Sequence, residues 1–301
     1  MKKVPILIMA FNRTDHVKQS MSVIRKYQPD KVYLEADGPR LNMPGEKETC
    51  EETRRAMLEM IDWPCEVKTL FREENLGCAR AVYGAISWFL ENEEFGIICE
   101  DDILLSPDFF TLCEDLLPRY ANNDKIQQIA AFNPSSKITI SDSYTFTKRP
   151  QIWGWATWRR AWFNNMDMSM SKWPNFRIWN IIRYYGVFQG IYMWYNWNQV
   201  YRNVEHCTTW DTQWHFASLA NGLLSICPCT NLSLNIGCTS GGVHFDVGDK
   251  DPYFGKKMGA IAFPLKQPKS VSLDWIQLYK DNLDFLRLRK IGLIKKIKRL
   301  L

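Results

Sequence analysis

ICEDDILLSPDFF, residues 98–110, places three adjacent carboxylates between two apolar runs, namely Glu100, Asp101 and Asp102. The apolar residues before the triplet predict a buried strand, and the S-P-D-F-F run after it predicts the start of a helix. Neighbouring carboxylates repel each other, so ionising all three is costly unless a cation lies close. The stretch therefore predicts a buried strand whose last residues emerge into a polar cleft.

The chain on either side alternates between short apolar strands and helices. Strands are predicted at 4–11, 31–36, 66–71 and 95–99, with helices at 14–24, 44–61 and 77–90. Beyond residue 107 the pattern predicts a helix at 108–120, a strand at 126–132, and a strand or loop at 141–149. The alternation predicts an α/β fold with a mostly parallel sheet flanked by helices. Because parallel sheets bind ligands beyond the carboxyl ends of their strands, we expect four polar clusters to meet at one edge: Asn12-Arg13, Asp37-Gly38, 72–75 and 100–102.

The composition is that of a folded protein with a large core, since 46% of the 301 residues are hydrophobic. Nine cysteines at scattered spacing form no C-x-x-C pair, and an odd number cannot all pair internally. We therefore expect reduced thiols in a cytosolic protein. The basic and then apolar first residues reach Asn12-Arg13 early and offer no small-residue cleavage site, which argues against a signal peptide and for a cytoplasmic location.

The carboxyl-terminal residues differ from the rest of the chain in charge. Residues 287–301 carry seven Lys or Arg and no acid, which exceeds the net charge of +5 and leaves residues 1–286 close to neutral. A near-neutral body does not favour nucleic acid as a partner. Apolar residues at three- and four-residue spacing over 284–301 predict a basic amphipathic helix, which fits an anionic membrane surface. The alternative is that its apolar stripe packs on the body.

The order of the motifs resembles the GT-A class of nucleotide-sugar glycosyltransferases, and most of all the eukaryotic N-acetylglucosaminyltransferase I family. That family also has an E-D-D motif before a P-D-F-F helix. The segments FNR, DG, NLG, IAAFN and the G-W pair of QIWGWATW follow in the same order, and W-D-x-Q-W and N-L-x-x-N-I-G are shared with bacterial polysaccharide glycosyltransferases. The resemblance covers about residues 4–246. It implies a Rossmann-like GT-A catalytic domain over 1–265, with a nucleotide-binding half at 1–105 and an acceptor half at 106–265, followed by an extension at 266–301.

The resemblance also implies the residues that hold the donor and a metal ion. Mn²⁺ or Mg²⁺ would be held by Asp102, with His244 as a second contact, because hard oxygen ligands suit these cations. The expected donor contacts are Asn12, Arg13, Asp37 (to the base, which suggests uracil), Arg80 (to the diphosphate), Glu100 and Asp101 (to the ribose or as support), and Trp153 and Trp155 (to a sugar ring). From the residues alone, a helix cap is an equally good explanation of the triplet, with Asp102 or Ser106 capping the helix after Pro107. Arg13 and Arg80 fit surface ion pairs, and the tryptophans fit a core.

Asp211 is the candidate catalytic base. It lies between Trp210 and Trp214 in TTWDTQWHF, and desolvation by these rings is expected to raise its pKa above the reference of about 3.9. In an inverting transfer this carboxylate would take the proton from the acceptor hydroxyl. Without the resemblance, Asp211 fits the N-cap of a helix.

The sequence thus predicts a metal-dependent inverting glycosyltransferase that moves a sugar from a nucleotide diphosphate sugar to a glycan or a lipid-linked oligosaccharide. A UDP sugar is favoured, with an N-acetylglucosamine-like sugar as one option. One alternative is a sugar nucleotidyltransferase, which usually carries a Gly-rich loop where this chain has FNRTDH. The other is a non-catalytic carbohydrate-binding protein built from the tryptophans.

Overall fold

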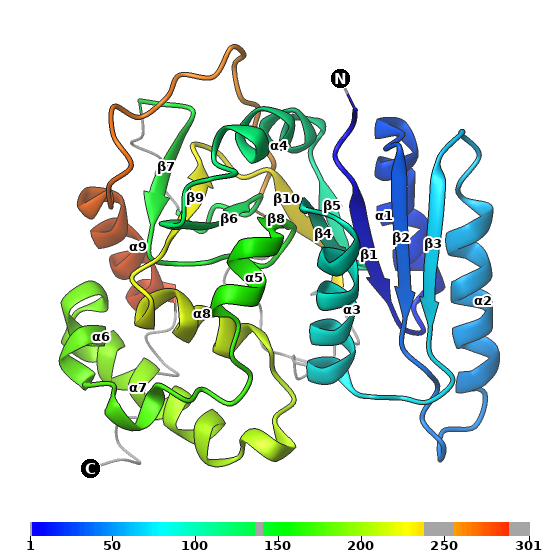
Figure 1. The fold of residues 1–301 in the computed structure, drawn as a ribbon, viewed down its shortest axis with the longest axis horizontal. Helices are drawn as coiled ribbons and strands as arrows, with labels where there is room; N and C mark the ends of the chain where they lie inside the picture. The colour runs from blue at the N-terminus through cyan, green and yellow to red at the C-terminus, as the bar shows by residue number, and fades with distance from the viewer. Residues whose placement is uncertain (1, 136–140, 238–255, 289–301) are drawn as a thin grey trace.

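The computed structural model describes residues 2–135, 141–237 and 256–288, and its centre is a large sheet with helices on both faces (Figure 1). The sheet has eight strands in the order β3-β2-β1-β4-β8-β6-β9-β7, and β5 and β10 form a second, two-stranded sheet. The strands are β1 (Ile6–Ala10), β2 (Lys31–Ala36), β3 (Glu66–Phe71), β4 (Phe95–Glu100), β5 (Ile103–Leu105), β6 (Ile126–Ala130), β7 (Tyr144–Thr147), β8 (Trp155–Trp158), β9 (Leu224–Pro228) and β10 (Ser233–Asn235).

Most strands of the large sheet run in one direction. β3, β2, β1 and β4 pair in parallel, and β6 and β9 continue that direction. Only β8 and β7 run against their neighbours in the described part of the chain. The predicted α/β fold with a mostly parallel sheet is confirmed, and the residues at 141–149 left open between strand and loop contain β7.

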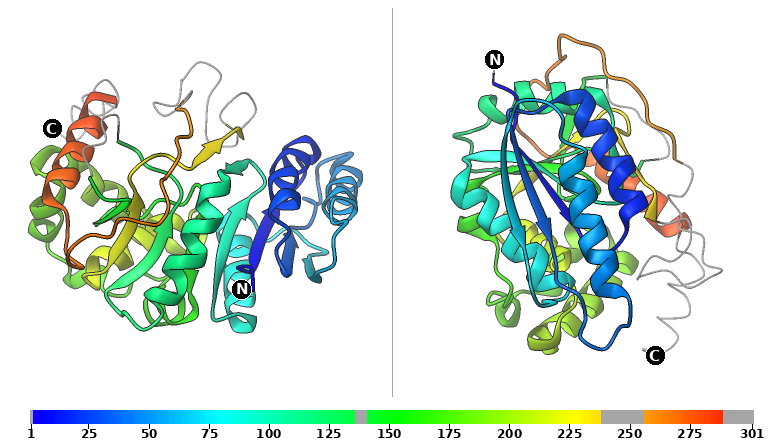
Figure 2. Two further views of the ribbon diagram at one scale, coloured as in Figure 1. Left: turned by 90° about the horizontal axis from the view of Figure 1, so that it is seen from above. Right: turned by 90° about the vertical axis from the view of Figure 1, so that its right-hand side faces the viewer.

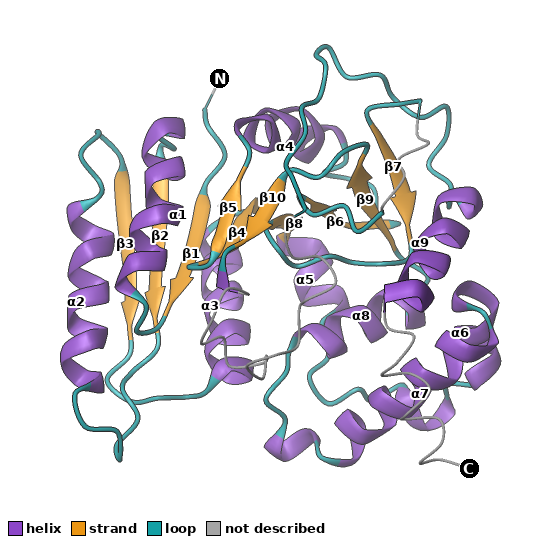
Figure 3. Cartoon of the chain, turned by 180° about the vertical axis from the view of Figure 1, so that it is seen from behind, coloured by secondary structure: helices purple, strands orange, loops and turns teal. Residues whose placement is uncertain are grey.

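The helices cover both faces of this sheet (Figures 2 and 3). They are α1 (Thr14–Tyr27), α2 (Glu46–Glu59), α3 (Cys78–Asn92), α4 (Pro107–Arg119), α5 (Arg159–Asn165), α6 (Ile178–Tyr185), α7 (Val187–Arg202), α8 (Asp211–Ala220) and α9 (Trp275–Leu288), with short 3₁₀ turns at Trp173–Asn175 and Val204–His206. Successive β1 residues point to opposite faces, so Ile6 and Ile8 pack with α1, α2 and α4, whereas Leu7 and Met9 pack with α3, α5 and α8.

The core crosses the expected boundary between the two halves of the catalytic domain. One hydrophobic cluster contains Ile8 and Ile97 from before residue 105 together with Ile129 and Ile226 from after it. The two halves therefore share a packed interior, which fixes the ends of β1–β4 relative to the later helices.

The tryptophans are mainly core residues, as expected of aromatic side chains. Eight of the 13 are less than 9% exposed: Trp63, Trp155, Trp158, Trp162, Trp173, Trp197, Trp210 and Trp214. Trp173 and Trp197 belong to a separate aromatic cluster under α6, α7 and the end of α8. A carbohydrate-binding surface built from most of the tryptophans does not fit this burial.

The predicted amphipathic helix at 284–301 is described only at its start, because α9 ends at Leu288 and 289–301 lie outside the described residues. α9 begins at Trp275 and packs on the body: Leu278 is buried, and Asn282 donates to the Tyr184 carbonyl at 2.8 Å. The docked arrangement therefore holds for 275–288. Among the described helices, none has both the length and the apolar character needed to cross a membrane.

Candidate active site

The acidic triplet lies at the carboxyl end of β4. Glu100 is the last residue of this strand, and the next two acids form the turn into β5. The cap of the following helix is Ser106, whose hydroxyl accepts the Asp108 N–H at 3.3 Å, while Pro107 takes the first helical position. The triplet is therefore not the cap of α4, and its charges need another explanation.

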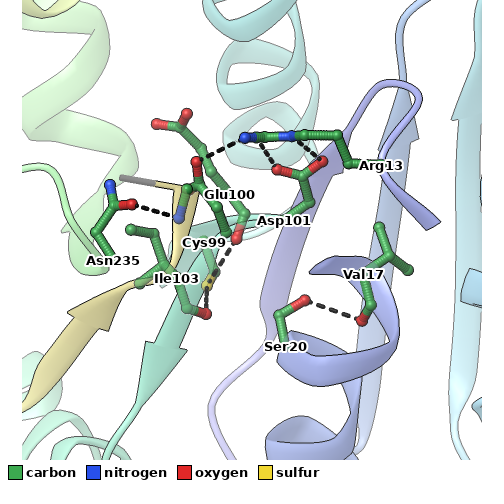
Figure 4. A network of polar contacts seen from close by, with 10 residues as sticks. Arg13, Val17, Ser20, Cys99, Glu100, Asp101, Ile103 and Asn235 are labelled. Atoms are coloured by element: carbon green, nitrogen blue, oxygen red, sulfur yellow. Dashed lines mark hydrogen bonds and ion pairs between the residues drawn. The ribbon is translucent and has the colours of Figure 1, made fainter. Parts of the chain in front are cut away.

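Arg13, which follows β1, holds two of the three acids (Figure 4). Its Nε donates to Asp101 Oδ2 at 3.3 Å, its Nη2 pairs with the other oxygen of Asp101, and its Nη1 donates to Asp102 Oδ2 at 3.0 Å. Asp101 is 2% exposed, so its carboxylate is largely out of water. The structure thus brings three predicted site residues together, with the arginine partly neutralising the acids.

The surroundings of the triplet raise two of its carboxyl pKa values. Burial raises the pKa of Asp101 to about 7, although the Arg13 guanidinium lowers it. Burial, followed by the charges of Asp102, Asp101 and Asp211, raises the pKa of Glu100 to about 8. Carboxylates held at such values are poised to gain a cation or a proton.

Asp211 therefore lies close enough to the triplet for its charge to act on Glu100, although 110 positions separate them in the sequence. It is the first residue of α8 and is partly exposed, whereas Trp210 on one side and Trp214 one turn later are buried. Trp210, not Asp211, holds the N-cap position, so the cap interpretation of Asp211 is wrong. Asp211 and Glu100, the candidate base and one candidate donor residue, thus lie near each other at the carboxyl end of β4.

Asp37, at the end of β2, ties the neighbouring loop to that edge. Its carboxylate accepts the backbone N–H groups of Gly38 at 2.9 Å, Leu76 at 3.0 Å and Gly77 at 3.1 Å. Asn75 returns a bond from its Nδ2 to the Gly38 carbonyl at 2.8 Å. Asp37 thus joins the loop after β2 to the loop before α3. Its contact with a nucleobase stays a prediction.

Gly38 approaches the β3–α3 loop too closely for any side chain. A Cβ at this position would lie 2.3–2.6 Å from the backbone N, C and O atoms of Glu74. We expect Gly38→Ala to lower the free energy of unfolding by about 2 kcal/mol or more, because backbone atoms cannot swing aside and the Asp37 bonds must break. Gly84→Ala on α3 is the matched control, since its Cβ meets only the end of the Arg72 side chain at 3.0 Å. Equal urea midpoints for the two variants would contradict this account.

Asn12 and Arg80 occupy different positions at the edge. Asn12 donates from Nδ2 to Glu46 Oε1 at 3.0 Å, and Arg40 also holds this glutamate, with Nε at 3.0 Å from Oε2. Arg80 is exposed in the first turn of α3 and makes no ion pair with any described residue. The sequence did not single out Glu46, whose only signal is its place at the start of α2 opposite the FNR turn.

Gly237 covers Asp102 from the other side. The Ile236 N–H donates to the Asp102 carbonyl at 2.8 Å, and Asn235 Oδ1 accepts the Gly237 N–H at 2.8 Å. A Cβ on Gly237 would lie 2.3 Å from Asp102 Oδ2 and 3.1 Å from Arg13 Nη1. The N-I-G motif therefore forms one wall of the site. His244 lies outside the described residues.

The two candidate sugar-stacking tryptophans differ in exposure. Trp155 is 1% exposed, and its ring stacks on Trp210 with centroids 5.8 Å apart, so protein covers it and its assignment to sugar stacking is wrong for this arrangement. Trp153 is partly exposed and packs beside Phe132 at 4.6 Å. Trp153 therefore remains the candidate for stacking on a sugar ring.

Glu35, inside β2, is a buried acid that the sequence analysis did not single out. It is 2% exposed, and Arg72 Nε lies 3.2 Å from its Oε1. Burial raises its pKa to about 8, although the guanidinium lowers it. An alternating strand pattern would have flagged it, but β2 is buried on both faces and hides this signal.

The raised pKa of Glu35 has a consequence for stability. Because the folded pKa lies above the unfolded value, its contribution is complete at low pH and is lost as the pH rises from about 4.5 to about 8. We expect Glu35→Gln to reduce the fall in unfolding free energy across this range. The control Glu73→Gln, at an exposed glutamate, should leave the fall in unfolding free energy unchanged. Parallel pH profiles for the wild type and Glu35→Gln would refute the raised pKa of Glu35.

The donor set around Asp102 suits a cation that brings its own ligands. Among the residues described, no group of three or more His, Cys, Asp or Glu side chains is arranged to hold a metal ion. Mg²⁺ and similar cations are commonly held by one or two carboxylates together with substrate phosphates. The carboxylates of Glu100 and Asp102 fit that pattern.

The comparisons with known proteins reach only a distant likeness. No family model matches the chain, and no curated protein matches its sequence. Mouse xyloside xylosyltransferase 1 is 10% identical, with a TM-score of 0.36 over 73% of this chain and 84% of its own. The glycosyltransferase GlyE of Streptococcus pneumoniae TIGR4 is 11% identical (TM-score 0.28, 58% of this chain and 41% of its own), and HddC of Yersinia pseudotuberculosis is 9% identical (0.30, 52% and 77%). TM-scores this low carry no weight for function.

Proposed function

We propose that this protein is a metal-dependent inverting glycosyltransferase that uses a nucleotide diphosphate sugar. The observation that carries the proposal is the convergence of Asp211 on the Glu100–Asp102 triplet at the carboxyl ends of the parallel strands. Parallel α/β sheets bind nucleotides at this edge. An inverting transfer requires a base at the acceptor and positive charge at the leaving diphosphate. The two carboxylate groups fit these roles, the second by holding a cation.

Asp211 is the proposed base. It would take the proton from the acceptor hydroxyl as that oxygen attacks C1 of the donor sugar, opposite the leaving diphosphate. Its partial exposure at the start of α8 leaves it open to an acceptor.

Glu100 and Asp102 would hold Mn²⁺ or Mg²⁺, which supplies positive charge for the diphosphate as the sugar departs. Arg13 holds the Asp102 carboxylate through one oxygen, at 3.0 Å, and fixes its direction. Gly237 permits the backbone to close over the same carboxylate. These residues orient the donor end of the site.

The loop organised by Asp37 is the proposed place for the base of the nucleotide. A carboxylate oxygen can accept more than one hydrogen bond, and Asp37 Oδ2 accepts only the Gly77 N–H among the described groups. That oxygen could accept the imide N–H of uracil, which favours a UDP sugar. Trp153 would contact the donor sugar, and a glycan or lipid-linked saccharide is the proposed acceptor.

Arg13 offers a direct test of the donor end. Arg13→Gln is expected to weaken binding of UDP in the presence of Mn²⁺ by about tenfold, because Asp101 and Asp102 lose the charge that positions them. Arg25→Gln, which breaks an exposed ion pair with Asp62, is the matched control and should leave binding unchanged. Titration calorimetry measures both, and equal affinities would argue against this role.

A further inference from the structure

The face formed by α7 and α9 exposes large apolar side chains that the proposed reaction does not use. Ile276, Tyr279 and Phe188 are 68%, 64% and 63% exposed. With three further exposed residues they form what we call the apolar face: Val187, Phe188, Ile191, Trp275, Ile276 and Tyr279. Large apolar groups gathered on one face typically mark an interaction surface.

The helices that carry these residues lie close to one another. Tyr184 of α6 stacks on Trp275 of α9 with centroids 5.6 Å apart, and Tyr192 of α7 lies 5.8 Å from Phe285 of α9. Figure 1 shows α6, α7 and α9 gathered at the side remote from α2 and β3, with α6 and α7 toward the end at which the β2 and β3 arrowheads point. α7, which carries half of the apolar face, therefore lies toward the same end of the molecule as the carboxyl ends of β2 and β3.

The segment that carries α6 and α7 has charges of one sign. Residues 168–204, which include α6 and α7, carry four Lys or Arg and no Asp or Glu. The acids of α9 are directed into the body: Asp281 is 5% exposed and pairs with the Ser135 hydroxyl, and Asp284 is 8% exposed. Just before the helix, Asp274 accepts from Thr145 Oγ1 at 3.0 Å. The chain then continues from α9 into a stretch with seven cations at 287–301.

We propose that the apolar face docks on the surface of an anionic lipid bilayer. Aromatic and aliphatic side chains enter the headgroup region, while Lys and Arg beside them attract anionic lipids. A protein partner would also cover apolar groups, but the absence of acids across 168–204 together with the basic chain end fits a surface of uniform negative charge. The proposal does not depend on glycosyl transfer. If both hold, the acceptor would be presented on a lipid.

The test is co-sedimentation of the full-length protein with lipid vesicles. One set contains phosphatidylcholine alone, and the other contains about 30 mol% phosphatidylglycerol, which makes the surface strongly anionic. We expect binding only to the anionic vesicles, and a fall as salt rises. Phe188→Ser and Ile276→Ser should each lower the partition coefficient roughly tenfold. Arg183→Glu, on the exposed face of α6, should lower it severalfold.

Matched controls lie on the opposite side of the molecule. Leu41→Ser removes a side chain that is 96% exposed, and Arg55→Glu reverses an exposed charge on α2, so neither should alter vesicle binding. Deletion of residues 289–301 distinguishes the contribution of the basic chain end to vesicle binding from that of the apolar face. If that truncation abolishes binding while Phe188→Ser and Ile276→Ser leave it unchanged, the proposal is wrong. Self-association that the two serine variants abolish, with no vesicle binding, would assign the face to a second copy of the chain and overturn it. Neither readout involves a sugar donor.

Discussion

Asp211→Asn is expected to lower kcat for sugar transfer by about 10²–10⁴-fold, while the affinity for the donor nucleotide stays within about threefold. Asparagine keeps the size and polarity of the side chain at the start of α8, but it cannot accept the proton of the acceptor hydroxyl. The substitution also removes the negative charge of Asp211, which raises the pKa of Glu100, so this pKa should be lower in the variant.

Glu205→Gln provides the control for Asp211, since it changes an exposed acid a few positions earlier. Transfer is followed by release of nucleoside diphosphate, and donor affinity by titration calorimetry. A variant that transfers at the wild-type rate would exclude Asp211 as the base. A variant that no longer binds donor would assign Asp211 to the donor end.

Asp102→Asn is the second change with a large expected effect. The amide keeps an oxygen that can accept from Arg13 Nη1, so the contact now made at 3.0 Å need not be lost and the fold should persist. The negative charge that would hold a cation and the donor diphosphate is removed, and we expect transfer to fall by at least about a hundredfold. Stabilisation of the protein by UDP with Mn²⁺ should fall in parallel.

The matched control is Asp115→Asn on α4, where a partly exposed acid pairs with Arg119. Melting curves of both variants without ligand report on folding. If Asp102→Asn keeps full Mn²⁺-dependent stabilisation by UDP, Asp102 does not hold the cation, and Glu100 or a residue outside the described part of the chain would have to do so.

The first part of the fold could be predicted closely because local patterns determine it. β2 and β3 begin and end at the predicted residues, and Asp37-Gly38 was expected at the polar edge. The later strands could not be ordered from the sequence, since β8 runs antiparallel between β4 and β6 and joins residues from both halves of the chain. Such long-range pairing leaves no local signal.

The site divides in the same way. The acidic triplet can be recognised from the sequence, because three adjacent charges directly after a buried strand are unusual. Its contact with Arg13 and its nearness to Asp211 depend on how distant segments pack, so the sequence could name the residues but not their partners. Trp155 shows the limit: a ring in a motif shared with a donor-binding family lies in the core, because burial is set by α8 packing against β8 and not by the motif.

Binding of nucleotide sugars tests the central claim most directly. Thermal unfolding of the wild-type protein is measured with UDP-, GDP- and dTDP-sugars, each with and without Mn²⁺. We predict that one of these classes, with UDP sugars favoured, raises the Tm by several degrees, that Mn²⁺ enlarges the shift, and that Asp102→Asn removes the enlargement. No shift with any of the sugars in either condition would contradict the assignment of this site to a nucleotide-sugar glycosyltransferase.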